Sequence, residues 1–158
     1  MPFALTPERD RELSEILTRY PNKMAACIPA LHLCQDQHGW VSDDIVDFVS
    51  KKLDLPTSHV KGVVTFYTMY HTHPVGRHFI QVCTTSPCHI CGAADVVKAL
   101  LQATGCGELG ATSPDGRFTV IEVECLGACG FATPVMVNEE FIESVTPDRV
   151  PDLLASLR

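Results

Sequence analysis

The hydrophobic period of this chain changes near residue 74, and that change constrains the fold more than any other feature. Before it, apolar residues recur at the spacing of one helix face. After it, short apolar runs of strand length alternate with helical segments. Pro74-Val75-Gly76 interrupts the chain at the point of change. We therefore predict two domains, a helical bundle over residues 1–73 and a mixed α/β domain over residues 74–158.

Four short helices are expected in the first domain. Thr6-Pro7 predicts the first helix start, because a threonine hydroxyl caps a helix and proline is tolerated at its first position. Further helices are expected over about residues 23–37, from Asp43 onward, and after Pro56. The run Thr65–Tyr70 is unusually aromatic, which indicates core packing in part and a subunit interface in part.

The second domain is expected to be a small sheet with helices packed on it. Strands are predicted over residues 78–82, 118–123, 134–138 and 140–144. Helices are predicted over residues 92–103 and at the C-terminal end, from about Val150 to Leu157. The fold class predicted for the whole chain is α+β.

Composition excludes several classes of function. The chain has nineteen acidic and twelve basic residues, a net charge of −7 and no basic run, which argues against nucleic acid as a partner. No apolar stretch approaches the ~20 residues of a membrane span. The N-terminal residues resemble neither a secretory signal nor a transit peptide, so a cytoplasmic location is expected. In a reducing compartment, eight cysteines indicate metal binding or redox chemistry rather than disulfides.

Two tight cysteine pairs carry most of the functional information. Cys83 and Cys88 are separated by four residues, and Cys125 and Cys129 by three. Each pair follows a strand-like run at the point where it breaks into a turn. Four thiolates complete the coordination of the two irons in a [2Fe–2S] cluster. Glycines beside the second pair would let backbone N–H groups reach the sulfur atoms.

The cysteine spacing leaves other arrangements open. Cys83, Cys88 and Cys91, with Cys125 as a distant fourth ligand, match the plant-type ferredoxin spacing. Cys88, Cys91, Cys125 and Cys129 would suit a zinc site. A Cys88/Cys91 dithiol would suit thiol–disulfide chemistry. Five cysteines thus compete for four positions, and spacing alone does not choose among them.

The remaining signals are weaker. Cys27 and Cys34 fall on one helix face and are expected to be small core residues, whereas Cys106 is expected to be a loop thiol. Residues 105–110 match the dinucleotide pattern G-x-G-x-x-G but follow a helix rather than a strand, so we reject that site. His89 lies inside the first cysteine loop, where it would be either a proton-coupled tuner of a cluster or a solvent-facing residue.

Ordered blocks of sequence from about Pro21 to the C-terminus carry a resemblance to a known family. They are Leu31-His32-Leu33, Gly39-Trp40, residues 60–69 and 74–78, Cys83 with Cys88, Asp115-Gly116-Arg117-Phe118, and Cys125-Leu126-Gly127 with Cys129. On these blocks the chain resembles the [2Fe–2S] peripheral-arm subunit of respiratory NADH:quinone oxidoreductase, complex I. That family has a thioredoxin-like ferredoxin domain.

The resemblance implies a fold and a ligand set. The implied fold is an N-terminal helical bundle followed by a thioredoxin-like α/β domain that carries a [2Fe–2S] cluster. The implied cluster ligands are Cys83, Cys88, Cys125 and Cys129. The family does not require a cysteine at the position of Cys91. One departure is that Thr133 stands where the family usually has proline, with Pro134 following it.

The resemblance also implies a function. The chain would be an electron-transfer subunit of the NADH dehydrogenase module of complex I, with no substrate site of its own. Its cluster would exchange an electron with FMN in a partner subunit, which also binds NADH. Other partners would be further iron–sulfur subunits, at the cytoplasmic face of the inner membrane without insertion. The alternatives are the equivalent diaphorase subunit of an NAD-linked hydrogenase or formate dehydrogenase, and a zinc-binding structural module.

Overall fold

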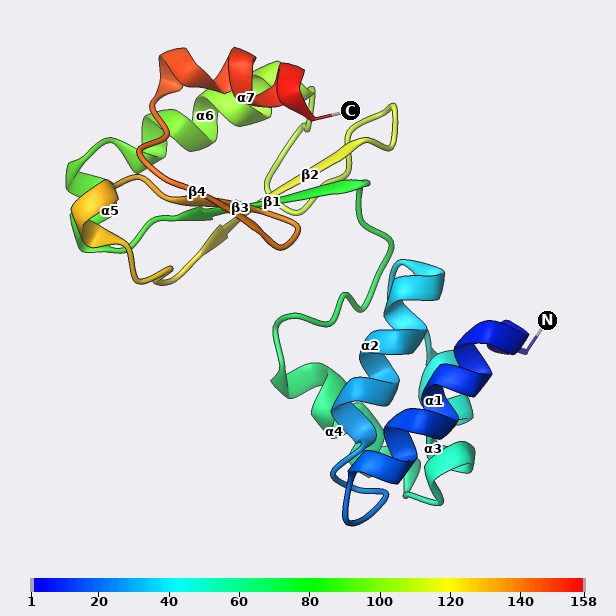
Figure 1. Ribbon diagram of the computed structural model, residues 1–158. Coiled ribbons are helices and arrows are strands. Elements are labelled where there is room, and N and C mark those ends of the chain that lie inside the picture. Colours follow the sequence, from blue (N-terminus) through cyan, green and yellow to red (C-terminus); the bar gives the residue numbers. More distant parts are fainter. Residues whose placement is uncertain (1, 158) are drawn as a thin grey trace. The chain divides into compact units, whose positions relative to one another are not determined.

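The structure, a computed structural model, describes residues 2–157, and the chain forms two compact units that divide between Pro74 and Val75. The first unit contains four helices (Figure 1). These are α1 (Pro7–Arg19), α2 (Cys27–His38), α3 (Asp43–Leu53) and α4 (Thr57–Phe66). Helix α2 begins later than the sequence pattern predicts, because residues 23–26 form turns.

Local capping explains where two of these helices begin. The Thr6 hydroxyl accepts a hydrogen bond from the backbone N–H of Arg9 at 3.3 Å, and Ser42 caps α3 in the same way. The inner faces of the helices meet in one apolar core. Its fully buried side chains include Leu13, Leu31, Ile45, Val49, Leu53 and Val60. Cys27 and Cys34 are buried in the same core and act there as small apolar residues.

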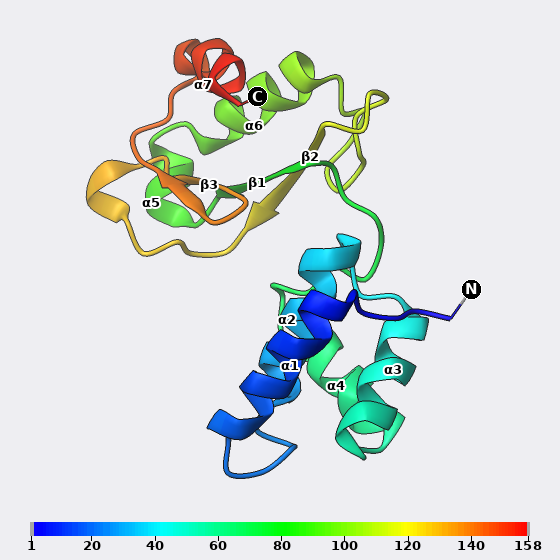
Figure 2. The same ribbon diagram turned by 45° about the vertical axis from the view of Figure 1, so that its right-hand side comes forward.

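The second unit is built on a four-stranded sheet with strand order β2-β1-β3-β4. The strands are β1 (His78–Cys83), β2 (Phe118–Val123), β3 (Val135–Val137) and β4 (Glu140–Ile142). Three helices accompany them, α5 (Ser86–Ile90), α6 (Ala93–Thr104) and α7 (Val150–Ser156). Figures 1 and 2 show α6 and α7 on one face of the sheet. The predicted α+β class is confirmed.

The pairing of the strands determines which strand ends lie next to one another. Strands β1 and β2 are parallel, with Cys83 opposite Val123. Strands β1 and β3 are antiparallel, with Val82 opposite Val135. Three segments therefore lie at the same end of the strands. They are the segments that follow β1 and β2 and the segment that precedes β3.

The core of the second unit lies between the sheet and α6. Side chains from alternate strand positions are buried against one face of that helix, as the period of two requires. The buried set includes Ile80, Val82, Val120, Val135, Val96 and Leu100. Among residues 2–157, no helix is both long enough and apolar enough to cross a membrane.

Gly76 generates a stability prediction. A Cβ added there would lie 2.5 Å from the carbonyl carbon of Phe118, which belongs to the backbone of β2 and cannot move aside freely. We expect Gly76→Ala to destabilise the second unit by about 1–3 kcal/mol, as overpacking does. Chemical denaturation followed by far-UV circular dichroism measures this change.

Gly62 provides the matched control, because a Cβ added there meets nothing within 4 Å and the residue lies inside α4. Gly62→Ala should raise the stability of the first unit by ~0.5–1 kcal/mol. Trp40, the single tryptophan, reports on that unit by fluorescence. If Gly76→Ala has the same free energy of unfolding as wild type, the backbone of β2 at Phe118 can shift to make room for the added Cβ, and the prediction is wrong.

His78 generates a pH prediction. It is buried at the start of β1, and burial lowers the pKa of His78, as does the positive charge of Arg77 and Arg117. Unfolded histidine takes up a proton near pH 6.5, whereas folded His78 resists it. The free energy of unfolding of the second unit should therefore be highest above pH 6.5 and should fall as the pH drops below it. Urea denaturation between pH 8 and pH 5 measures the slope.

His78→Phe should flatten that slope, since phenylalanine does not titrate. His71 belongs to the first unit, and burial and the nearby His73 lower the pKa of His71 as well. His71→Phe should therefore leave the slope of the second unit unchanged. If the free energy of unfolding changes with pH equally in wild type and in His78→Phe, then His78 is not the cause of that pH dependence.

Candidate functional site

The first cysteine pair is held by the end of β1 and by a short helix. Cys83 is the last residue of β1, and Cys88 lies in the five-residue helix α5. The spacing of the cysteines predicts only a loop here. Thr85 at the N-cap position and Pro87 in the first turn are helix-start signals that could have identified the helix.

The second pair follows β2. Cys125 lies two residues beyond the end of that strand, and Cys129 opens a 3-10 turn over Cys129–Phe131. Two backbone hydrogen bonds tie these segments to the first pair. The N–H of Thr84 donates to the carbonyl of Val123 at 3.2 Å, and the N–H of Cys83 donates to the carbonyl of Pro134 at 3.3 Å. Figures 1 and 2 show α5 and the 3-10 turn side by side at one end of the sheet.

The two thiols of the first pair are in contact. The Sγ atoms of Cys88 and Cys83 lie 3.4 Å apart, and both side chains are buried in a small apolar cluster with Ala93. Two thiolates on one tetrahedral metal, with metal–sulfur bonds of about 2.3 Å, are about 3.8 Å apart. The pair therefore needs little rearrangement to bind a single iron.

Hydrogen bonds favour a thiolate at Cys83. Burial alone would raise the pKa of Cys83, but hydrogen bonds from the backbone N–H groups of Leu126 and Thr85 and from the side chains of Cys88 and Thr85 outweigh it and lower the pKa. In its protonated form the Cys83 thiol donates to the carbonyl oxygen of Glu124 at 3.0 Å. The amide groups of both cysteine loops thus converge on this sulfur.

The pKa of Cys88 responds to the other three predicted ligands. Burial, the hydrogen bond to Cys83, and the negative charges of Cys83, Cys129 and Cys125 together raise the pKa of Cys88 to about 11. The structure therefore brings Cys83, Cys125 and Cys129 within electrostatic range of Cys88. Such mutual repulsion is relieved when cations bind between the sulfur atoms.

The second pair is more open than the first. Cys125 and Cys129 are exposed, and the N–H of Gly127 lies 3.4 Å from the Sγ atom of Cys125. Gly127 has φ +76°, a left-handed conformation that glycine adopts without strain. Cys91 is also exposed, at the C-terminal end of α5. Exposure alone thus does not separate Cys91 from the second pair.

The donor set fits a two-iron cluster. It consists of four thiols from two loops, with N–H donors from Leu126, Thr85 and Gly127 directed at the sulfur atoms. Within residues 2–157, no three His, Cys, Asp or Glu side chains are grouped as ligands of one metal ion. A [2Fe–2S] cluster is compatible with that geometry, because each of its irons takes only two protein thiolates.

Two weaker sequence signals, Cys106 and the G-x-G-x-x-G pattern, lie after α6 and outside the two cysteine pairs. Cys106 lies in the loop after α6, as predicted, and is buried there, with its Sγ atom 3.5 Å from the carbonyl oxygen of Phe118. It is buried because the segment after α6 packs against β2. Gly105 is the C-cap of α6, so the G-x-G-x-x-G pattern does follow a helix.

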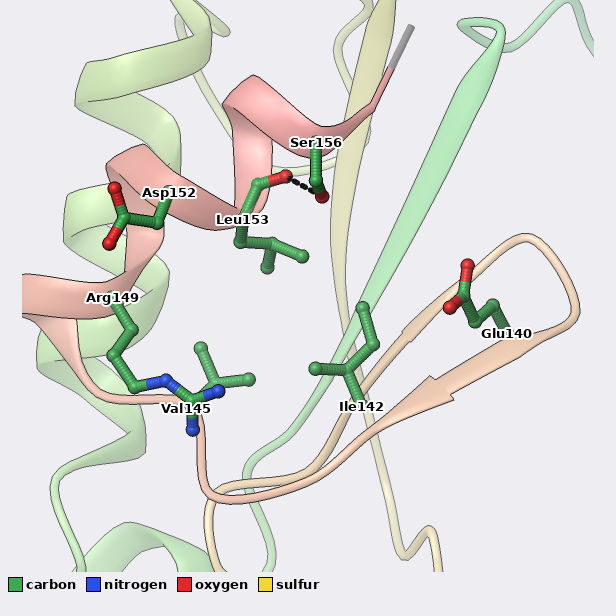
Figure 3. Close-up of a pocket in the computed structure, with 7 residues that line it drawn as sticks. All are labelled: Glu140, Ile142, Val145, Arg149, Asp152, Leu153 and Ser156. Carbon is green, nitrogen blue, oxygen red and sulfur yellow. Dashed lines mark hydrogen bonds between the residues drawn. The ribbon is translucent and has the colours of Figure 1, made fainter.

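A hollow of about 320 Å³ lies between β4 and α7, away from the cysteines (Figure 3). It is lined by Glu140, Ile142, Val145, Arg149, Asp152, Leu153 and Ser156. Two of its polar side chains already form hydrogen bonds to backbone carbonyl groups. Arg149 donates to the Ser144 carbonyl at 2.7 Å, and Ser156 donates to the Leu153 carbonyl at 2.6 Å. Because no cysteine lines it, this hollow is separate from the candidate metal centre.

Solved structures share the fold. In crystal structures of an NAD+-reducing [NiFe]-hydrogenase, one chain matches 83% of this chain with a TM-score of 0.71 in the H2-reduced state and 85% with a TM-score of 0.67 in the air-oxidized state. Both matches are 21% identical in sequence, and this chain spans about a fifth of the hydrogenase chain, 22%. At this identity they support the fold alone.

Sequence comparisons show the family. The chain is 39% identical over 152 residues to an NADH-quinone oxidoreductase subunit of Pseudomonas aeruginosa, covering 96% of this chain and 91% of the relative. It is 37% identical over 147 residues to the corresponding protein of Rickettsia bellii, covering 91% and 87%. NADH dehydrogenase [ubiquinone] flavoprotein 2, mitochondrial, of Dictyostelium discoideum is 36% identical over 160 residues, covering 99% and 64%. Residues 13–158 match the family described as thioredoxin-like [2Fe-2S] ferredoxin, and the chain therefore belongs to that family.

Proposed function

We propose that this chain is the electron-transfer subunit of the NADH dehydrogenase module of complex I, holding one [2Fe–2S] cluster that exchanges an electron with FMN in a partner subunit. The proposed ligands are Cys83, Cys88, Cys125 and Cys129. The observation that carries the proposal is the contact of the first two thiols, whose Sγ atoms lie 3.4 Å apart. The negative charges of Cys125 and Cys129 are among the causes that raise the pKa of Cys88 and support the second pair. The bacterial relatives named as parts of NADH-quinone oxidoreductase support the choice of complex.

The residues of this chain would bind the cluster and stabilise its charge. When bound, the cluster supplies a centre that accepts and releases one electron. The thiolates hold the irons, and the N–H groups of Leu126, Thr85 and Gly127 place positive dipole ends beside negatively charged sulfur. The buried pair in β1 and α5 limits the access of water to one side of the site.

Exposed apolar side chains support docking within an assembly. Ile90 and Phe131, on the two cysteine-bearing segments, are 85% and 55% exposed. On the first unit, Phe66 is 76% exposed, whereas Tyr70 is buried and donates its hydroxyl to the Ile28 carbonyl at 2.9 Å. In the aromatic run Thr65–Tyr70, the last residue is therefore part of the core and Phe66 is exposed. Aromatic residues are enriched at protein–protein interfaces, and we assign the exposed side chains on the cysteine-bearing segments to contact with the flavin subunit.

The two compact units are proposed to be separate domains, and the location is proposed to be the cytoplasmic face of the membrane within the larger complex.

The second candidate function is the equivalent diaphorase subunit of an NAD-linked hydrogenase or formate dehydrogenase. The structural likeness to the NAD+-reducing hydrogenase chain supports that fold-level alternative. The subunits that co-purify with this chain distinguish the two, since one host complex reduces quinone and the other oxidises hydrogen or formate.

The first test is the metal content of anaerobically purified protein. About two irons and two acid-labile sulfides per chain are expected, with a rhombic or axial EPR signal after dithionite reduction. Iron and sulfide are quantified on the same sample that is used for EPR. Zinc without sulfide, in a sample never exposed to oxygen, would replace this proposal with a zinc-binding structural module.

The second test is a series of cysteine substitutions. Cys83→Ser, Cys88→Ser, Cys125→Ser and Cys129→Ser should each lower cluster content per chain by about tenfold or more. Cys91→Ser should retain the cluster and serves as the exposed control. Cys106→Ser is the buried control. Loss in Cys91→Ser with retention in Cys129→Ser would instead select the plant-type ligand set.

A further inference from the structure

Thr133 carries a buried hydroxyl without a partner. Its side chain is 1% exposed, and Oγ1 has no hydrogen-bond partner within the protein. Nearly all buried hydroxyls in folded proteins are hydrogen-bonded. An unpaired one near a site that can hold a cofactor is a candidate donor to that cofactor.

The neighbours of Thr133 place it at the first cysteine pair. Ala132 packs against the cluster of buried side chains that contains Cys83 and Cys88. The carbonyl of Pro134 accepts the N–H of Cys83 at 3.3 Å. The Thr133 carbonyl itself accepts the N–H of Val145 at 2.9 Å. The backbone is thus anchored on both sides of Thr133, and its buried hydroxyl is not free to turn to solvent.

The second buried side-chain atom without a partner, within residues 2–157, is Nε2 of His78. His78 begins β1 and Cys83 ends it, so four residues lie between them, and the two ends are about 16 Å apart along the strand. Thr133 is therefore the one of the two that lies near the cysteines.

We propose that the Thr133 hydroxyl donates a hydrogen bond to a sulfur atom of the [2Fe–2S] cluster and so favours its reduced state. This inference rests on the proposed function. Reduction adds negative charge that is shared with sulfur, and a hydrogen-bond donor stabilises the more negative state more strongly. Thr133 is thus a residue that tunes the reduction potential, while the four cysteines hold the irons.

The test is a redox titration of the cluster in the purified chain, followed by EPR. Thr133→Val keeps the shape and removes the hydroxyl, and it should lower the equilibrium constant for reduction about tenfold, which is ~59 mV for one electron. Thr133→Ser restores the hydroxyl and should remain near the wild-type potential. Thr104→Val is the control, because Thr104 is buried at the end of α6 and donates to the Leu100 carbonyl at 2.7 Å. It should leave the potential unchanged.

Pulsed ENDOR in H2O and D2O gives an independent readout, since wild type should show one exchangeable proton coupling beyond those of the backbone N–H groups, and Thr133→Val should lack that one coupling. An unchanged potential together with an unchanged proton coupling in Thr133→Val would overturn this inference. If Thr133→Val fails to fold, Thr133→Ala takes its place with the same expectations, again compared with Thr133→Ser. Absence of a cluster from the wild-type chain would overturn the proposed function instead, so the two failures are distinguishable.

Discussion

The candidate site depends on the parallel, in-register pairing of β1 with β2. Because Cys83 lies opposite Val123, the segments that follow both strands leave the sheet at the same edge. A slip of one residue would turn Cys83 to the other face of the sheet and separate it from the N–H of Leu126. The antiparallel β3 then brings Pro134 against Cys83. Two ladders of backbone hydrogen bonds thus fix three chain segments around one point, before any cofactor contributes.

Placing the two thiols of the first pair in contact has an electrostatic cost, and the pKa values of Cys83 and Cys88 are shifted in opposite directions. Burial and neighbouring charge raise the pKa of Cys88, whereas amide hydrogen bonds lower the pKa of Cys83. Cys83 is therefore the more acidic thiol of the first pair, and the Cys88 thiol donates the hydrogen bond between them. Metal binding requires both to be thiolates, so it would release the Cys88 proton and replace that hydrogen bond with two metal–sulfur bonds.

Local signals were sufficient for most of the fold and insufficient for the site. Caps such as Thr6 and the change of period near Pro74 depend on neighbouring residues only, and the helices and strands they predicted are present. Helix α5 was missed because five residues are too few to show a period. The N–H of Leu126 on Cys83 and the unpaired hydroxyl of Thr133 arise from contacts between segments far apart in the sequence. Spacing therefore identified the cysteine pairs but not the groups around them.

The two halves of the site differ in how they are held, and that difference bears on how it would work. Cys83 and Cys88 are buried on regular elements and lie in contact before metal binds. Cys125 and Cys129 are exposed on a glycine-containing loop, which can adjust to a cofactor at low cost. Phe131, exposed on the same loop, gives that side an apolar contact surface. A cofactor in this site would therefore be shielded on the side of Cys83 and Cys88, which are buried, and more open on the side of Cys125 and Cys129, which are exposed.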